Sequence, residues 1–145
     1  MATVSGCDIR DDRYYWVEKH VWVQQGDGDL IVIGMTDVAQ HLASSLVAVT
    51  PKKVGRTIKK GKSVATVESG KFVGPVPTPL TGEVIEVNDA LVDDPQLANR
   101  DPYGDGWIVK LKAEDWAGEI DDLPTGDAAV EAYQAYLTQE GISCE

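Results

Sequence analysis

The 145-residue sequence has little of what metal sites, disulfide frameworks and membrane anchors require. Its two cysteines, Cys7 and Cys144, lie near opposite ends of the chain and form no C-x-x-C pair. We therefore expect no metal site, and we interpret both cysteines as free thiols of a reducing compartment. No apolar run approaches the roughly 18 residues of a membrane span, and no signal-peptide pattern opens the chain. These absences predict a cytoplasmic protein without a membrane partner.

Groups for catalysis are also scarce. The sequence shows no Ser-His-Asp set, no glycine-rich phosphate loop and no cluster of metal ligands. His41 falls on the polar side of a short predicted helix that offers no second ligand, so we interpret it as a surface side chain. We expect no catalytic residues of the chain's own, and hence no enzyme.

Positive charge is limited to 13 Lys and Arg against 24 Asp and Glu, which gives a formal net charge of −11. This balance excludes nucleic acid as an expected partner, because phosphate binding requires many cations. Six of the 13 basic residues nevertheless lie within residues 52–62: Lys52, Lys53, Arg56, Lys59, Lys60 and Lys62. Two interpretations stay open: a solvated loop, or a docking strip for an acidic partner surface. We expect this segment to lie in the part of the domain that leads to Lys71.

The length fits a single domain with a sizeable core. We expect a flexible, polar N-terminal arm over residues 1–13 and one domain over residues 14–145. Aromatic and β-branched residues predict a strand over 14–25, and Thr36 is a good N-cap for a short helix after the next strand. An apolar stripe predicts a C-terminal helix over 127–140.

The most informative stretch, residues 67–84, reads V-E-S-G-K-F-V-G-P-V-P-T-P-L-T-G-E-V. An alternating strand pattern ends there, a short polar turn follows, and a second strand begins at Phe72, so Lys71 projects from a β-turn. We expect Gly70 to supply a positive φ for this turn. An exposed lysine most often serves solubility, but its place at a hairpin tip indicates that Lys71 carries the function.

Five motifs stand in order along about 115 residues and include the lysine. They are K-H-V-W-V at 19–23, I-G-M-T-D-V-A-Q at 33–40, V-E-S-G-K at 67–71, G-E-V-I-E-V-N-D-A-L at 82–91 and N-R-D-P-Y-G-D-G-W-I-V-K at 99–110. As a set they resemble the lipoyl and biotinyl carrier domains, and within that superfamily the H proteins of glycine cleavage systems.

This resemblance implies a mainly β, flattened barrel-sandwich hybrid with short helices and a C-terminal helix. It also implies lipoate attached to Lys71 through an amide, with Glu68, Ser69 and Gly70 as the recognition turn. Biotin carriers place methionines on both sides of the modified lysine, whereas Lys71 lies between Gly70 and Phe72, so lipoate is the better choice. Such a protein is a swinging-arm carrier that presents its cofactor to other enzymes.

The residues next to the lysine depart from the glycine cleavage pattern. H proteins of that system usually read E-S-V-K-A-A-S, whereas this chain reads E-S-G-K-F-V-G-P-V. Their first motif reads H-E-W, whereas Val21 separates His20 and Trp22 here, so any role of that acid is lost. With V-T-P-K-K-V-G-R-T-I-K-K-G-K at 49–62 and G-C-D-I at 6–9, the sequence resembles lipoate-binding proteins of the heterodisulfide-reductase-like sulfur oxidation pathway.

That second resemblance implies a sulfur cargo moved by thiol–disulfide chemistry. The implied partners are a heterodisulfide-reductase-like complex, sulfur transferases, a lipoate-attaching enzyme and a dihydrolipoamide dehydrogenase. Two alternatives stay open: an H protein of glycine cleavage that carries aminomethyl groups, and a non-lipoylated interaction module. The lysine retained in an intact turn argues against the latter.

Overall fold

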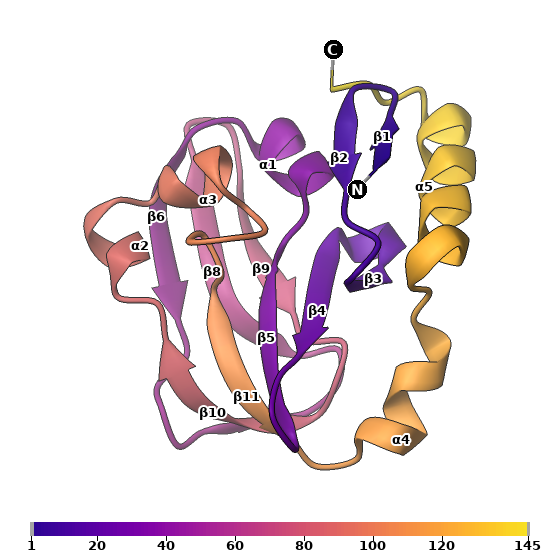
Figure 1. The fold of residues 1–145 in the computed structure, drawn as a ribbon. Helices are drawn as coiled ribbons and strands as arrows, with labels where there is room; N and C mark the ends of the chain where they lie inside the picture. The colour runs from indigo at the N-terminus through magenta and orange to yellow at the C-terminus, as the bar shows by residue number, and fades with distance from the viewer. Residues whose placement is uncertain (1, 145) are drawn as a thin grey trace.

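The computed structural model describes residues 2–144, which form three β-sheets and a set of short helices with one longer helix at the C-terminal end (Figure 1). The strands are β1 (Ala2–Val4), β2 (Cys7–Ile9), β3 (Tyr14–Trp16), β4 (Val21–Gln25), β5 (Leu30–Met35), β6 (Leu46–Pro51), β7 (Thr57–Ile58), β8 (Ser63–Ser69), β9 (Val73–Pro77), β10 (Gly82–Val87) and β11 (Val109–Ala113). The helices are η1 (Val17–Lys19), α1 (Asp37–Ala43), α2 (Ala90–Asp93), α3 (Leu97–Arg100), α4 (Trp116–Glu119), η2 (Ile120–Asp122) and α5 (Gly126–Glu140).

Two of the sheets enclose the main core. One has the strand order β3-β4-β5-β11-β10-β7 and the other the order β6-β8-β9, and every pairing is antiparallel. Val23 and Leu111 from the first sheet and Val49 and Val67 from the second belong to one cluster of buried side chains. The predicted mainly β fold with short helices and a C-terminal helix is confirmed.

The strand predicted over residues 14–25 is interrupted. Its first part, β3, turns through η1 and pairs back on β4, with Tyr15 opposite Trp22. His20 adopts a left-handed conformation with φ 57° at this reversal. A uniform run of strand-forming residues hides such a turn, because no glycine or proline marks it.

Helix α1 begins as the sequence predicts. The hydroxyl oxygen of Thr36 accepts a hydrogen bond from the backbone N–H of Ala39 at 3.1 Å, which satisfies one of the free donors of the first turn. His41 on this helix is exposed, as expected. Of the helices within residues 2–144, none combines the length and the apolar character needed to cross a membrane.

Helix α5 packs against the N-terminal part of the chain. Its buried residues Ala129, Tyr133 and Leu137 join a second apolar cluster with residues of β1, β2 and β3. Figure 1 shows α5 running alongside this layer, at one side of the two main sheets. The helix therefore completes a smaller core beside the larger one.

Residues 2–9 do not form the flexible arm expected from their polarity. Strands β1 and β2 pair as a hairpin, and Cys7 and Ile9 are fully buried against α5. Asp8 accepts a hydrogen bond on its backbone oxygen from the Tyr103 hydroxyl at 2.7 Å. The expectation was wrong because the apolar residues of this segment alternate over too few positions to indicate a strand.

The two cysteines are joined in a disulfide, which corrects the interpretation of both as free thiols. Cys7 and Cys144 are 137 residues apart in the sequence, and the backbone N–H of Cys144 also donates to the Ser5 carbonyl at 2.9 Å. The bond therefore ties the N-terminal hairpin to the segment after α5. Sequence separation alone offered no sign that the two ends meet.

Reduction of this disulfide should lower the free energy of unfolding by about 2–5 kcal/mol, because the bond restricts the unfolded chain over nearly its whole length. Urea denaturation with and without a phosphine reductant measures the change. The Cys7→Ser, Cys144→Ser double variant should unfold at the midpoint of the reduced protein in both conditions. Equal midpoints for the oxidised and reduced wild-type protein would contradict the disulfide.

Candidate functional site

The hairpin of β8 and β9 places Lys71 at the end of the three-stranded sheet. Glu68 pairs with Val73 in the register, and the backbone N–H of Ser69 donates to the Phe72 carbonyl at 2.8 Å. Ser69 is buried and its hydroxyl accepts the Lys71 N–H at 3.4 Å, whereas Glu68 is exposed. The lysine side chain is thus exposed at the tip of a turn that is closed by backbone bonds, as the sequence predicts.

Gly70 does not have the positive φ that we expected. The glycines with φ in the left-handed region are Gly6, Gly28, Gly55, Gly61, Gly126 and Gly141. A Cβ added at Gly70 would meet no atom within 4 Å. The turn therefore does not depend on glycine at this position, which agrees with the valine found there in the resembled glycine cleavage sequences.

Gly74, in contrast, stands under an aromatic ring. A Cβ added there would come within 2.4 Å of the Phe72 ring. The Phe72 ring therefore lies close to the Gly74 backbone, and the absence of a side chain at Gly74 makes room for it. Gly74 pairs with Val67 in the register, so this contact is one step below the tip of the hairpin.

Apolar side chains surround the lysine on the surface. Val73 is 64% exposed and Phe72 is 44% exposed, both next to Lys71. Val47, at 58%, follows Leu46, the residue paired with Ser69. Exposed apolar groups at one end of a domain mark a surface that other molecules contact.

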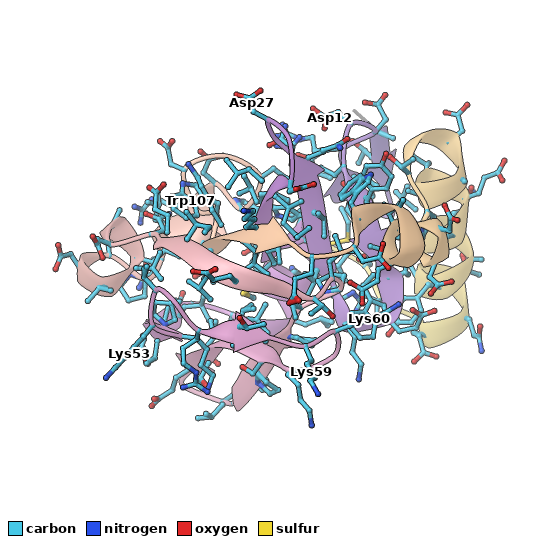
Figure 2. The ribbon with its side chains drawn as sticks, turned by 90° about the horizontal axis from the view of Figure 1, so that it is seen from below. Asp12, Asp27, Lys53, Lys59, Lys60 and Trp107 are labelled. Atoms are coloured by element: carbon cyan, nitrogen blue, oxygen red, sulfur yellow. A yellow bond between two sulfur atoms is a disulfide. The ribbon has the colours of Figure 1, made fainter. Side chains whose placement is uncertain are left out.

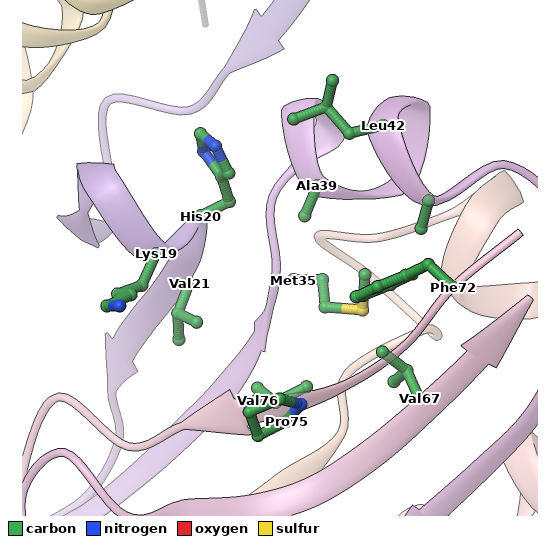
Figure 3. Close-up of a pocket in the computed structure, with 11 residues that line it drawn as sticks. Lys19, His20, Val21, Met35, Ala39, Leu42, Val67, Phe72, Pro75 and Val76 are labelled. Atoms are coloured by element: carbon green, nitrogen blue, oxygen red, sulfur yellow. The ribbon is translucent and has the colours of Figure 1, made fainter.

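A pocket of about 260 Å³ opens beside the hairpin, between α1, β4 and β9. Figure 3 shows the Phe72 ring reaching across it toward Met35 and Ala39. Its lining is Lys19, His20, Val21, Met35, Ala39, Leu42, Ala43, Val67, Phe72, Pro75 and Val76. This set is almost entirely apolar, and it contains one cation and no carboxylate.

His20 supplies the polar edge of the pocket. Its Nδ1 lies 3.4 Å from the Tyr133 hydroxyl, and its ring stacks on that of Tyr133. Burial lowers the pKa of His20 below its usual value, although the Glu18 carboxylate opposes this shift. The pocket is therefore bordered by a neutral imidazole at about pH 7.

The basic segment lies at the other end of the sheet from the lysine. Lys62 comes directly before β8, and Gly70 comes directly after it. The backbone N–H of Lys52 donates to the Val64 carbonyl, so Lys52 lies at the same end of β8 as Lys62. Seven residues of β8 at about 3.3 Å each separate the two ends by roughly 23 Å. The segment leads into β8 and so to the lysine turn, as expected, but the extended strand places the segment far from the lysine in space.

The sequence located the lysine but not the pocket. Met35 lies within one of the five motifs, and Phe72 and Val21 lie where the sequence departs from the glycine cleavage pattern. None of these patterns indicated that the three side chains line one pocket. Within residues 2–144 no group of three or more His, Cys, Asp and Glu side chains is placed to hold a metal ion. The arrangement offers an acylable amine on Lys71, next in the chain to Phe72, which lines an apolar pocket.

Comparisons with known proteins identify this arrangement. A family model described as glycine cleavage H-protein matches residues 13–136. The chain belongs to the glycine cleavage H-protein family. Glycine cleavage system H protein 5 of Aquifex aeolicus is 46% identical over 99% of both chains. The probable glycine cleavage system H protein 2 of Sulfurisphaera tokodaii is 44% identical over 100% of this chain and 99% of that protein.

A crystal structure agrees with the sequence relatives. The glycine cleavage system H protein from Mycobacterium marinum matches with a TM-score of 0.74 and 32% identity, over 92% of this chain and 100% of that one. H proteins are carriers rather than enzymes and hold lipoate covalently on a lysine, which confirms the predicted cofactor. A lipoate-attaching enzyme, dihydrolipoamide dehydrogenase and the glycine cleavage enzymes are partners of the family.

The residues at the hairpin fit a lipoyl group. Lys71 is exposed, so its amine is open to acylation, and the apolar pocket beside it suits the hydrocarbon part of the arm. Bound lipoate supplies thiol–disulfide chemistry through its dithiolane. The protein contributes a rigid base for the arm and a water-poor surface next to it.

Gly70→Ala should leave both folding and lipoyl attachment unchanged, since the added methyl group meets nothing and the backbone needs no positive φ. Gly74→Ala should displace the Phe72 ring and change the amide chemical shifts of the pocket while the barrel stays folded. Attachment rates from intact mass and ¹⁵N spectra measure both effects. A large loss of attachment in Gly70→Ala, or an unmoved ring in Gly74→Ala, would contradict this description of the turn.

Proposed function

We propose that this protein is a lipoyl carrier that bears its cofactor on Lys71 and presents it in turn to separate enzymes. The observation that carries the proposal is the exposed lysine at the tip of the β8–β9 hairpin, in the turn where the V-E-S-G-K motif ends. A short closed turn on a packed sheet holds the root of the arm while the arm itself stays mobile. The family's lipoate-attaching enzyme and dihydrolipoamide dehydrogenase are the expected common partners.

Lipoylation should occur at Lys71 and at no other lysine. The protein produced in cells supplied with lipoate should gain one lipoyl mass increment, and Lys71→Arg should lose it, because arginine offers no acylable amine. Lys59→Arg, an equally conservative change at another exposed lysine, is the matched control and should keep the increment. An increment that persists in Lys71→Arg would refute the assignment.

The pocket favours sulfur as the cargo of this arm. An aminomethyl group is a cation at about pH 7, yet Lys19 is the charged residue that borders the pocket, and the described lining holds no carboxylate. Val21 lines the pocket and occupies the position at which the H-E-W motif has a glutamate. In this pocket a cationic aminomethyl group would lie near Lys19 without a carboxylate to pair with, which is unfavourable. Sulfur is polarizable and packs well against apolar side chains. The implied partners are then a heterodisulfide-reductase-like complex and sulfur transferases.

The second candidate is the aminomethyl group, and the names of the relatives favour it. The similar proteins from Aquifex aeolicus, Sulfurisphaera tokodaii and Mycobacterium marinum are all described as glycine cleavage system H proteins. On this alternative the partners are the glycine cleavage enzymes, and the cargo stays clear of the cationic edge of the pocket. A non-lipoylated interaction module finds no support in the comparisons.

The two cargoes differ in one loading experiment. In its dithiol form, the lipoylated protein should take up sulfur from a persulfide donor, which leaves as a thiol. In its dithiolane form, it should accept aminomethyl groups only slowly from glycine and glycine decarboxylase, a step in which glycine loses CO₂ and the ring disulfide is reduced as the new C–S bond forms. Val21→Glu should raise aminomethyl loading severalfold, since it returns a carboxylate to the pocket. Val47→Glu adds the same charge to an exposed position outside the pocket and should not.

Intact mass follows both loading reactions, and circular dichroism checks that each variant folds. Wild-type protein that loads aminomethyl groups as fast as Val21→Glu, and takes up no sulfur, would establish the glycine cleavage alternative. Slow aminomethyl loading of every variant together with ready sulfur uptake would keep the sulfur cargo but remove the role given to Val21.

A further inference from the structure

The end of the molecule opposite Lys71 carries a surface that the carrier function does not use. The strand connections there carry the basic residues of segment 52–62, and Figure 2 shows Lys53 and Lys59 pointing outward at the lower edge of the view, with Lys60 further in. Lys60 is paired with Asp122 at 3.0 Å. Within residues 2–144, the other cations of the segment make no ion pair: Lys52, Lys53, Arg56, Lys59 and Lys62.

An exposed apolar residue stands among these charges. Val54 is 59% exposed, at the tip of a turn closed by the Arg56 N–H and the Lys53 carbonyl at 3.2 Å. Gly55 follows it with φ 94°, a conformation that favours glycine. The chain thus turns Val54 outward between Lys53 and Arg56 instead of folding it into the core.

The turn is held rigidly to the six-stranded sheet. The Gly55 N–H donates to the Val84 carbonyl at 2.8 Å, and the Val84 N–H donates to the Arg56 carbonyl at 2.8 Å. Val84 is itself fully buried in the main core. An apolar side chain fixed in this way loses little conformational freedom when a partner covers it, which lowers the cost of binding.

We infer that segment 52–62, named here the distal basic surface, is a docking site for an acidic protein surface with an apolar centre. Val54 with cations around it has the arrangement typical of protein interfaces, in which a polar rim surrounds an apolar centre. A phosphate backbone can pair with the cations but offers no aliphatic side chain to cover Val54, so the partner chemistry that fits both features is a protein surface with carboxylates around an apolar side chain.

The position of this surface gives it a distinct role. A partner held there is roughly 23 Å along β8 from the hairpin tip, so it leaves Lys71 open to a second enzyme. Docking at one end and transfer at the other would raise the effective concentration of the arm near its enzymes. Because neither the charges nor Val54 involve the arm, the inference does not depend on lipoylation.

A peptide titration tests the surface. The probe has six glutamates on each side of a leucine, and its counterpart has glutamine in place of the leucine. Titrated into unmodified ¹⁵N-labelled protein at low salt, the leucine probe should shift the amides of residues 52–62 and leave residues 69–73 unchanged. Its advantage over the counterpart, expected to be about fivefold in affinity, should disappear in Val54→Ser.

Matched variants separate docking from general charge effects. Val92→Ser changes a valine that is also 59% exposed, and it should keep the leucine preference. The Lys53→Gln, Lys59→Gln pair should weaken binding about fivefold at low salt, with a smaller loss at high salt. The Arg100→Gln, Lys110→Gln pair makes the same change in net charge outside the segment and should bind as the wild type does.

Three results would overturn the inference: shifts spread over the whole surface, equal losses of binding in the two double variants that remove positive charge, or tighter binding of a single-stranded DNA with as many charges as the peptide. Lys71→Arg should bind the probe as the wild type does. A protein that binds the probe but is never lipoylated would refute the proposed carrier function and leave the docking surface intact. The reverse result would refute only the docking surface.

Discussion

The backbone pairing of β8 with β6 on one side and β9 on the other determines where this protein can act. Its register places Ser69 opposite Leu46 and Glu68 opposite Val73, so both neighbours end where the lysine turn begins. Val67 anchors the same strand in the main core. Since a one-residue slip would turn Val67 outward, the buried face of β8 fixes the direction in which Lys71 leaves the sheet.

The same strand separates two surfaces of different character. At one end the lysine is surrounded by exposed apolar groups and by a pocket without carboxylates. At the other end the distal basic surface concentrates cations on a chain whose net charge is −11. The smaller core of α5 and the N-terminal hairpin is closed by the Cys7–Cys144 bond. Its Tyr133 contacts His20, which lines the pocket. A carrier that visits several enzymes gains from such a division, because one end can be held while the other reacts.

The sequence predicted the features that depend on neighbouring residues. The lysine turn, the Thr36 cap and the C-terminal helix follow from local pattern, and the motifs indicated the family. Features that depend on distant pairing were not predictable: the bond between Cys7 and Cys144 needs the chain ends to meet, and the distance of segment 52–62 from Lys71 follows from the length of β8. Gly70 is a local feature that was nevertheless predicted wrongly. A glycine in a tight turn suggested a positive φ, but the backbone does not adopt one there.

The most direct test of the carrier account is a tryptic peptide map of the protein isolated from its own cells. A lipoyl group on Lys71 blocks cleavage there, so the account predicts one peptide from residues 63–100 that carries the lipoyl mass and, in part, the mass of a bound cargo. An unmodified Lys71, cleaved to completion into peptides 63–71 and 72–100 in cells that lipoylate their other carrier proteins, would contradict it.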